Sequence, residues 1–235
     1  MVFALIAAGP SLDYCDQEIA SLSAQAAHFL LSDSIAAGFL RRFRPVQATV
    51  FTVELRRHAY LQRIPGGSAF SVMAYTGANE RNLRLNSGRR ITRFKLLHEK
   101  GDAPALYSPG TVAGTMLSYA VAQLVAKGGD GEIHLFGADL FYIDNQVYCR
   151  CIDPHAPPVS RLQSRELWQY EMALKKSSGI LAQSGFAIRT GFELMQAREN
   201  MRAFIARLPE SIRLVEYSPL GLDHPRVEKR IPGGA

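Results

Sequence analysis

Short apolar runs and longer amphipathic runs alternate along the 235 residues of this chain. The short runs predict strands near residues 2–8, 27–32, 47–53, 69–75, 132–137 and 211–216. Between them, apolar residues recur at every third and fourth position, which predicts helices at about 12–24, 34–43, 110–127, 161–184 and 191–207.

Strands that alternate with helices are typical of crossover units, and right-handed crossovers place helices on both faces of a sheet. We therefore expect an α/β fold, a Rossmann-like three-layer sandwich with a mostly parallel sheet and a small C-terminal helical part. Residues 1–160 would form its core. Residues 161–235 would add C-terminal helices and the late strand to the same domain.

Two stretches interrupt this alternation. Residues 76–91 are rich in Gly, Asn and Arg and have no clear period, and residues 144–160 combine Cys, His, Asp and Pro. Both predict loops. Long loops beyond the carboxyl ends of the strands are where open parallel sheets usually hold ligands.

The composition is that of a globular protein, with 47% hydrophobic and 20% charged residues. Lys and Arg outnumber Asp and Glu by 27 to 21, which suits a phosphorylated substrate, an anionic lipid surface or nucleic acid. Scattered basic residues on a solvated surface are the simpler explanation. We expect no nucleic-acid partner, because no basic stripe is interleaved with aromatic residues.

The first apolar run is short and ends at Gly9-Pro10-Ser11, which predicts a buried strand and neither a signal peptide nor a membrane span. Three cysteines cannot form a closed disulfide framework. Both observations favour a cytoplasmic protein without an integral membrane segment. Cys149 and Cys151 lie close to Asp153 and His155, but no second cysteine pair completes a zinc site, and we expect reduced cysteines.

A turn of small residues leaves the first predicted strand and opens the first predicted helix. Gly9 lets the backbone approach a ligand, and Pro10 and Ser11 follow, where Ser11 can cap the helix while neighbouring amides point at a phosphate. The turn is neither a dinucleotide fingerprint nor a P-loop. Since any strand-to-helix turn favours Gly, Pro and Ser, it predicts phosphate binding only weakly.

A second such turn precedes the predicted helix at 110–127. Ser108, Thr111 and Thr115 place hydroxyl groups around Gly110 at a helix amino end, which is a favourable position for an anion. A helix cap that packs tightly through Gly114 is the alternative explanation.

Acidic residues stand at the ends of three predicted strands. Asp33 follows the second strand, Glu54 the third, and Asp139 follows Gly137 after the fifth. Parallel strands would align these carboxylates along one rim, where they could orient a substrate or hold a metal. Capping of the next turn is the alternative for Asp139.

Two tyrosines, Tyr142 and Tyr148, stand six residues apart after Asp139. If the loop between them folds back, both phenols could donate hydrogen bonds to a phosphate. Positions in the core or on the surface are the alternative.

In this order the motifs resemble the motility accessory factor and 6-hydroxymethylpterin diphosphokinase-like family. The resemblance covers residues 1 to about 150 and rests on Gly9-Pro10-Ser11, Ser32-Asp33-Ser34, Pro45 before the strand that ends in Glu54, Gly110-Thr111-Val112 and Gly137-Ala138-Asp139. The succession is similar, more distantly, to the bacterial CMP-sialic acid sialyltransferases. That similarity implies that Gly9, Ser11 and Thr111 hold a nucleotide whose phosphate Tyr142 and Tyr148 support.

The resemblance implies a nucleotide-dependent transferase. The leading hypothesis is inverting transfer of a sugar, of the sialic or pseudaminic acid type, from a nucleotide-activated donor to an acceptor glycan, protein or small molecule. The nucleotide-binding residues would be Gly9, Pro10, Ser11, Asp33, Glu54, Ser108, Gly110, Thr111 and Gly137. The catalytic residues would be Asp139, Tyr142, Tyr148 and His155, with His155 as the base that takes the acceptor proton.

Two alternatives stay open. ATP-dependent diphosphoryl transfer to a pterin alcohol would need Mg²⁺, for which Asp33, Glu54 and Asp139 are candidate ligands. A nucleotide-binding protein that has kept the fold and lost its chemistry is the second. Glycosyl transfer does not firmly imply any cofactor, and the sequence does not decide whether the chain forms a homo-oligomer.

Overall fold

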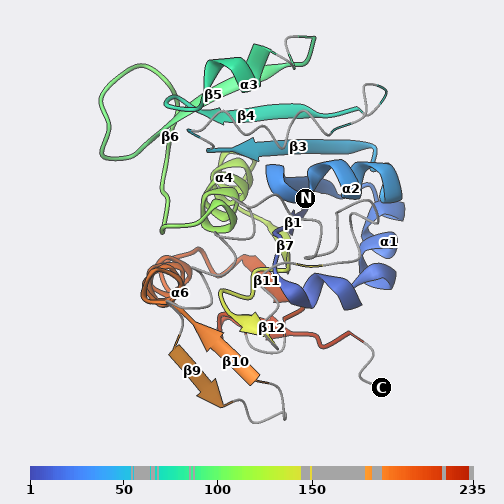
Figure 1. The fold of residues 1–235 in the computed structure, drawn as a ribbon, viewed down its shortest axis with the longest axis vertical. Helices are drawn as coiled ribbons and strands as arrows, with labels where there is room; N and C mark the ends of the chain where they lie inside the picture. The colour runs from blue at the N-terminus through green and yellow to red at the C-terminus, as the bar shows by residue number, and fades with distance from the viewer. Residues whose placement is uncertain are drawn as a thin grey trace, which may run out of the picture.

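The computed structural model describes residues 1–53, 55, 64, 67, 69–84, 86, 88–143, 149, 178–181, 187–218 and 221–232. They form a nine-stranded sheet in which all neighbouring strands run parallel (Figure 1). From edge to edge its strands are β12 (Val227–Lys229), β11 (Ile212–Glu216), β7 (Gly131–Phe136), β1 (Val2–Ile6), β2 (His28–Ser32), β3 (Gln47–Thr52), β4 (Ser71–Tyr75), β5 (Ile91–Leu96) and β6 (Ala105–Leu106).

Helices cover both faces of this sheet. One face carries η1 (Pro10–Tyr14), α1 (Asp16–Ala24), α2 (Asp33–Phe43) and α3 (Glu80–Arg84), and the other carries α4 (Val112–Ala126) and α6 (Phe192–Ile205). Because alternate residues of a strand point to opposite faces, β1 contributes to both cores. Phe3 and Leu5 pack with α4, whereas Ala4 and Ile6 pack with α1 and α2. The expected Rossmann-like three-layer fold is thereby confirmed.

The chain departs from the predicted elements at several points. The helix expected at 12–24 is divided at Cys15, whose backbone leaves helical geometry between η1 and α1. The loop expected at 76–91 contains α3, because Leu83 is buried in the core on that side of the sheet. Its last residue, Ile91, begins β5, which the sequence did not predict.

The end of the helix predicted at 161–184 is also wrong. Residues 178–181 form β9 (Ser178–Leu181), which pairs antiparallel with β10 (Ala187–Thr190). Gly179 is a poor residue for a helix interior, and strand pairing takes up its backbone groups. With β8 (Tyr142–Ile143), these strands form a small sheet in the order β8-β10-β9. The other residues of the predicted helix, 161–177 and 182–184, lie outside the described part of the chain.

The strand order reverses beside β1. The chain adds β2 to β6 on one side of β1, returns through α4, and then adds β7, β11 and β12 on the other side. Ligands of open α/β sheets bind outside the carboxyl ends of the strands at such a reversal. No helix in the described ranges is long and apolar enough to cross a bilayer.

Candidate functional site

A cavity of about 330 Å³ opens at this reversal, outside the carboxyl ends of β1, β2 and β7. This volume is within the range of ligand pockets. The residues that line the cavity are 7–9, 32–34, 111–113, 137–138, 140–141 and 194. The two small-residue turns predicted from sequence, one after β1 and one before α4, therefore face the same space.

The turn after β1 is packed tightly against the end of β7. The amide of Gly9 donates to the carbonyl oxygen of Gly137 at 2.8 Å, and the amide of Ser11 donates to Asp139 Oδ2 at 2.7 Å. A β-carbon at Gly9 would lie 2.5 Å from Asp139 Oδ2, and one at Gly137, where φ is +61°, would lie 2.5 Å from the carbonyl oxygen of Ala7. Both glycines are thus required for the close contact between the residues that follow β1 and those that follow β7. Pro10 and Ser11 are buried and do not line the cavity.

Asp139 lies behind this turn and does not line the cavity. Its side chain is buried, and burial raises the pKa of Asp139, while hydrogen bonds from Ser11 and Ser218 act in the opposite direction. A carboxylate that accepts the Ser11 amide fixes the path of the chain between β1 and α1.

A second buried carboxylate, Glu216, stands at the end of β11 and is completely inaccessible to solvent. Its two oxygens accept the amide of Leu222 at 2.9 and 3.0 Å, and Lys229 Nζ lies 2.6 Å from Oε2. Burial raises the pKa of Glu216, Lys229 opposes the shift, and the charge of Asp139 adds to it. Sequence reasoning missed Glu216, although it is an acidic residue at the end of a predicted strand, the same signal that pointed to Asp139.

The turn before α4 has a different arrangement. Thr111 is the N-cap of α4, and its hydroxyl accepts the amide of Gly114 at 3.1 Å. The Thr115 hydroxyl donates to the Thr111 carbonyl at 3.1 Å and lies 3.0 Å from Ser108 Oγ. These hydroxyls thus hydrogen-bond within the turn and the helix cap, although Thr111 also contacts Met201 Sδ and lines the cavity. Ser108 and Gly110 lie in the turn but do not line the cavity.

The amino end of α4 contributes to the cavity wall. Val112 and Ala113 open the helix and line the cavity. Amides of the first helical turn have no partner within the helix, and the helix dipole adds positive potential at this end. Such an end attracts phosphate or carboxylate.

The amino end of α2 faces the same cavity. Ser32, Asp33 and Ser34 all line it, and the Asp33 carboxylate accepts the Thr52 hydroxyl at 2.7 Å. Asp33 is thus tied to the end of β3. The cavity-lining residues that the structure describes include no Lys or Arg, so an anion bound here would depend on helix ends and amides.

An apolar part of the cavity wall is formed by Leu140, Phe141 and Leu194. Leu140 has a φ of 56°, which is rare for a bulky residue and typical of functional sites, and its carbonyl accepts the Thr190 hydroxyl at 3.2 Å. The guanidinium of Arg198 lies 5.3 Å from the centre of the Phe141 ring. This wall suits the flat face of a base or sugar.

A search of solved structures finds a likeness to the MAf glycosyltransferase from Magnetospirillum magneticum AMB-1. The TM-score is 0.58 at 13% sequence identity, and the match covers 97% of this chain but 33% of that one. The likeness establishes the fold, and this chain spans about a third of the length of that protein. No protein-family model matches the chain, and no curated protein matches it significantly.

Several predicted site residues are not placed by the structure. Glu54, Tyr148 and His155 lie outside the described residues, and of Tyr142 the structure describes only the backbone, which begins β8. Of the three carboxylates expected along one rim, the structure places two. Asp33 is in the cavity wall, and Asp139 lies behind the first turn. Within the described ranges, no three His, Cys, Asp or Glu side chains are grouped to hold a metal ion.

Proposed function

We propose that this chain is a nucleotide-dependent transferase whose donor is a nucleotide-activated sugar. The observation that carries the proposal is the meeting of the Gly9 and Thr111 turns at one cavity beside the reversal of strand order. The fold likeness to a protein named as a glycosyltransferase supports it.

The donor would be held by its phosphate and by its flat ring. The amides of Val112 and Ala113 at the amino end of α4 would bind the phosphate oxygens. The base or sugar would lie on the apolar wall formed by Leu140 and Phe141. A sialic or pseudaminic acid type of sugar is proposed from the sequence resemblance.

Departure of the nucleotide phosphate would be the step that the cavity assists. Negative charge grows on the leaving phosphate during transfer, and preorganised amides at the amino end of a helix stabilise such charge. We assign the removal of the acceptor proton to His155 and hydrogen bonds to the phosphate to Tyr142 and Tyr148. Asp139 would act as a positioning residue, because it binds the Ser11 amide and does not line the cavity.

Replacement of one amide tests the phosphate site. Val112→Pro removes the first N–H of α4, at a position where helices tolerate proline. The preceding Thr111 has φ −139° and ψ 156°, the extended geometry that a residue before proline prefers. A hydrogen bond to a charged group contributes roughly 1.5–3 kcal/mol, so nucleotide affinity should fall at least about tenfold at unchanged melting temperature.

The measurement is calorimetric titration of CMP, UDP, GDP and ATP, followed by the same titrations with the variant. Thr111→Ser is the matched control, since it changes the same turn and keeps every amide. Equal affinity in wild type and Val112→Pro, or no nucleotide binding at all, would contradict the proposed site. Full activity in the presence of a chelator would exclude diphosphoryl transfer, and binding without hydrolysis or transfer of any donor would favour the inactive alternative.

A further inference from the structure

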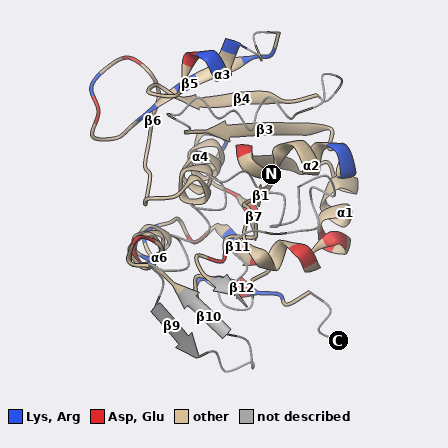
Figure 2. Ribbon diagram, viewed as in Figure 1, with Lys and Arg blue, Asp and Glu red and all other residues tan. Residues whose placement is uncertain are grey.

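Most of the net positive charge of the chain comes from one segment. Residues 80–100 contain seven Lys and Arg against two Glu, a surplus of five in a chain whose total surplus is six. Both glutamates are already engaged, since Glu80 pairs with Arg93 at 2.6 Å and Glu99 accepts the Tyr75 hydroxyl. Figure 2 shows basic residues gathered on α3 and the chain around it. The segment therefore has positive charge that its own carboxylates do not neutralise.

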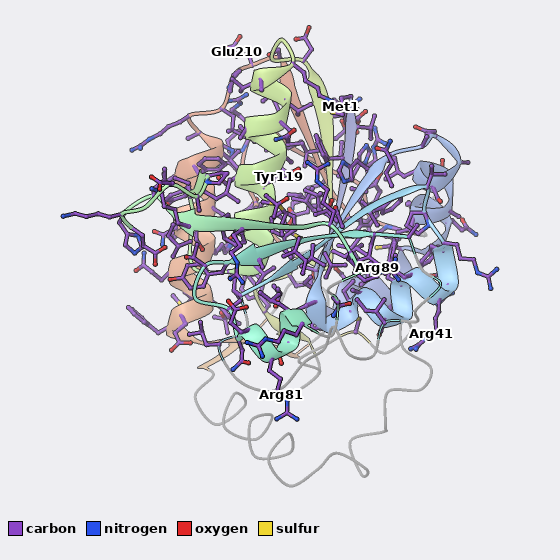
Figure 3. All side chains as sticks on the ribbon, turned by 90° about the horizontal axis from the view of Figure 1, so that it is seen from above. Met1, Arg41, Arg81, Arg89, Tyr119 and Glu210 are labelled. Atoms are coloured by element: carbon purple, nitrogen blue, oxygen red, sulfur yellow. The ribbon has the colours of Figure 1, made fainter. Side chains whose placement is uncertain are left out.

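Three arginines carry this uncompensated charge. Arg81, Arg84 and Arg90 are exposed, and none of them pairs with a carboxylate in the described part of the chain. In Figure 3 the side chain of Arg81 projects away from α3. Arg89, in the same segment, lies over the ring of Phe70 at 4.4 Å.

The same segment forms an incompletely paired edge of the sheet. β6 pairs with Lys95 and Leu96 only, so residues 91–94 of β5 have no outer neighbour among the described strands. Arg90 and Phe94 use their carbonyls to accept amides of β4 and the residue after it. Because backbone groups of alternate residues point to opposite sides, the N–H and C=O of Ile91 and Arg93 point outward. Figure 3 views the molecule from this edge.

We propose that an acidic polypeptide segment docks on this edge as an additional strand beside β5. Strand addition uses main-chain hydrogen bonds for affinity, and the outward groups of Ile91 and Arg93 provide them. The guanidinium group matches a carboxylate in a two-pronged hydrogen bond, so Arg90 and the arginines of α3 select Asp and Glu side chains. A second copy of this chain is disfavoured as the occupant, because it would bring the same positive charge to the edge.

Fluorescence anisotropy with a labelled, extended peptide of alternating Glu and Val tests the docking. The wild-type protein should bind it, and added salt should weaken the binding because exposed charges are screened. N-methylation of alternate peptide amides removes the backbone donors without changing the charge and should abolish binding. In hydrogen exchange, the amides of Ile91 and Arg93 should exchange more slowly when the peptide is bound.

A matched pair of variants separates a local effect from a change of net charge. Arg90→Glu should weaken peptide binding at least about tenfold, whereas Arg207→Glu, an equal change at an exposed arginine of the turn after α6, should leave it within about twofold. Equal binding of the N-methylated peptide, or of an acidic oligosaccharide of equal charge, would overturn the proposal of strand addition. So would the absence of peptide binding. No nucleotide takes part in the assay, so its result does not depend on the proposed transferase function.

Discussion

The two turns that meet at the cavity look alike in sequence but use their backbone groups in opposite ways. After β1, the amides of Gly9 and Ser11 both donate to residues that directly follow β7, Gly137 and Asp139. Before α4, Thr111 accepts the amide of Gly114, and Val112 and Ala113, which open the helix, line the cavity. The first turn is a structural joint, and the second presents binding groups.

This difference shows that a turn of small residues does not itself indicate a phosphate site. Glycine and serine are favoured both where a ligand approaches the backbone and where another strand does. The two cases are distinguished by following each buried amide to its acceptor, because buried backbone donors are almost always paired. At Gly9 the acceptor belongs to the protein, so the glycine is needed even when no ligand is bound.

Gly9→Ala is the strongest test of the joint. Its new β-carbon would meet Asp139 and the backbone of Gly137, neither of which can move freely, and overpacking of this kind should cost about 3 kcal/mol in the free energy of unfolding. Urea denaturation measures the loss. Gly88→Ala is the control, because nothing lies within 4 Å of a β-carbon there. Wild-type stability in Gly9→Ala would mean that the joint is loose.

Thr111→Ala tests the other turn and should have a smaller effect. Loss of an N-cap side chain costs about 1 kcal/mol of stability, which thermal unfolding would detect. Nucleotide affinity should change by less than about threefold, because the amides of Val112 and Ala113 remain in place, and Thr111→Ser should restore stability. Abolished nucleotide binding at nearly normal stability would show that the hydroxyl itself contacts the ligand.

The central strands could be predicted because they are buried and their apolar runs are continuous. β5 was missed for the opposite reason. Edge strands carry charged residues that discourage unwanted pairing, and Arg93 and Lys95 hide the strand pattern of residues 91–96. The antiparallel pair β9 and β10 was missed because the sequence pattern places residues 178–181 at the end of a predicted helix, although the two strands are neighbours along the chain.

The candidate site was predictable only in its parts. Local composition marked the Gly9 and Thr111 turns, and the alternation of strands and helices placed both at one end of the sheet. The partner of Ser11 could not be read locally, since Asp139 lies 128 positions further along the chain. For the same reason nothing in the sequence linked Leu194 to the cavity wall.

Asp139→Asn should produce the smallest change and sharpens the description of the joint. Asparagine keeps an oxygen acceptor for the Ser11 amide but cannot ionise. Burial raises the pKa of Asp139, so its contribution to stability is complete below the unfolded value, about 4, and is lost as the pH rises through the folded pKa. The variant should therefore match wild type in acid and become relatively more stable toward neutral pH.

Urea denaturation between pH 4 and 8 gives the curves of stability against pH for the two proteins, with exposed Asp102→Asn as the control. Glu216, whose pKa is also raised, leaves a residual slope in both proteins. Parallel curves for wild type and Asp139→Asn would show that ionisation of Asp139 does not destabilise the folded protein. The amide of Ser11 would then have to stabilise the carboxylate more than this geometry implies.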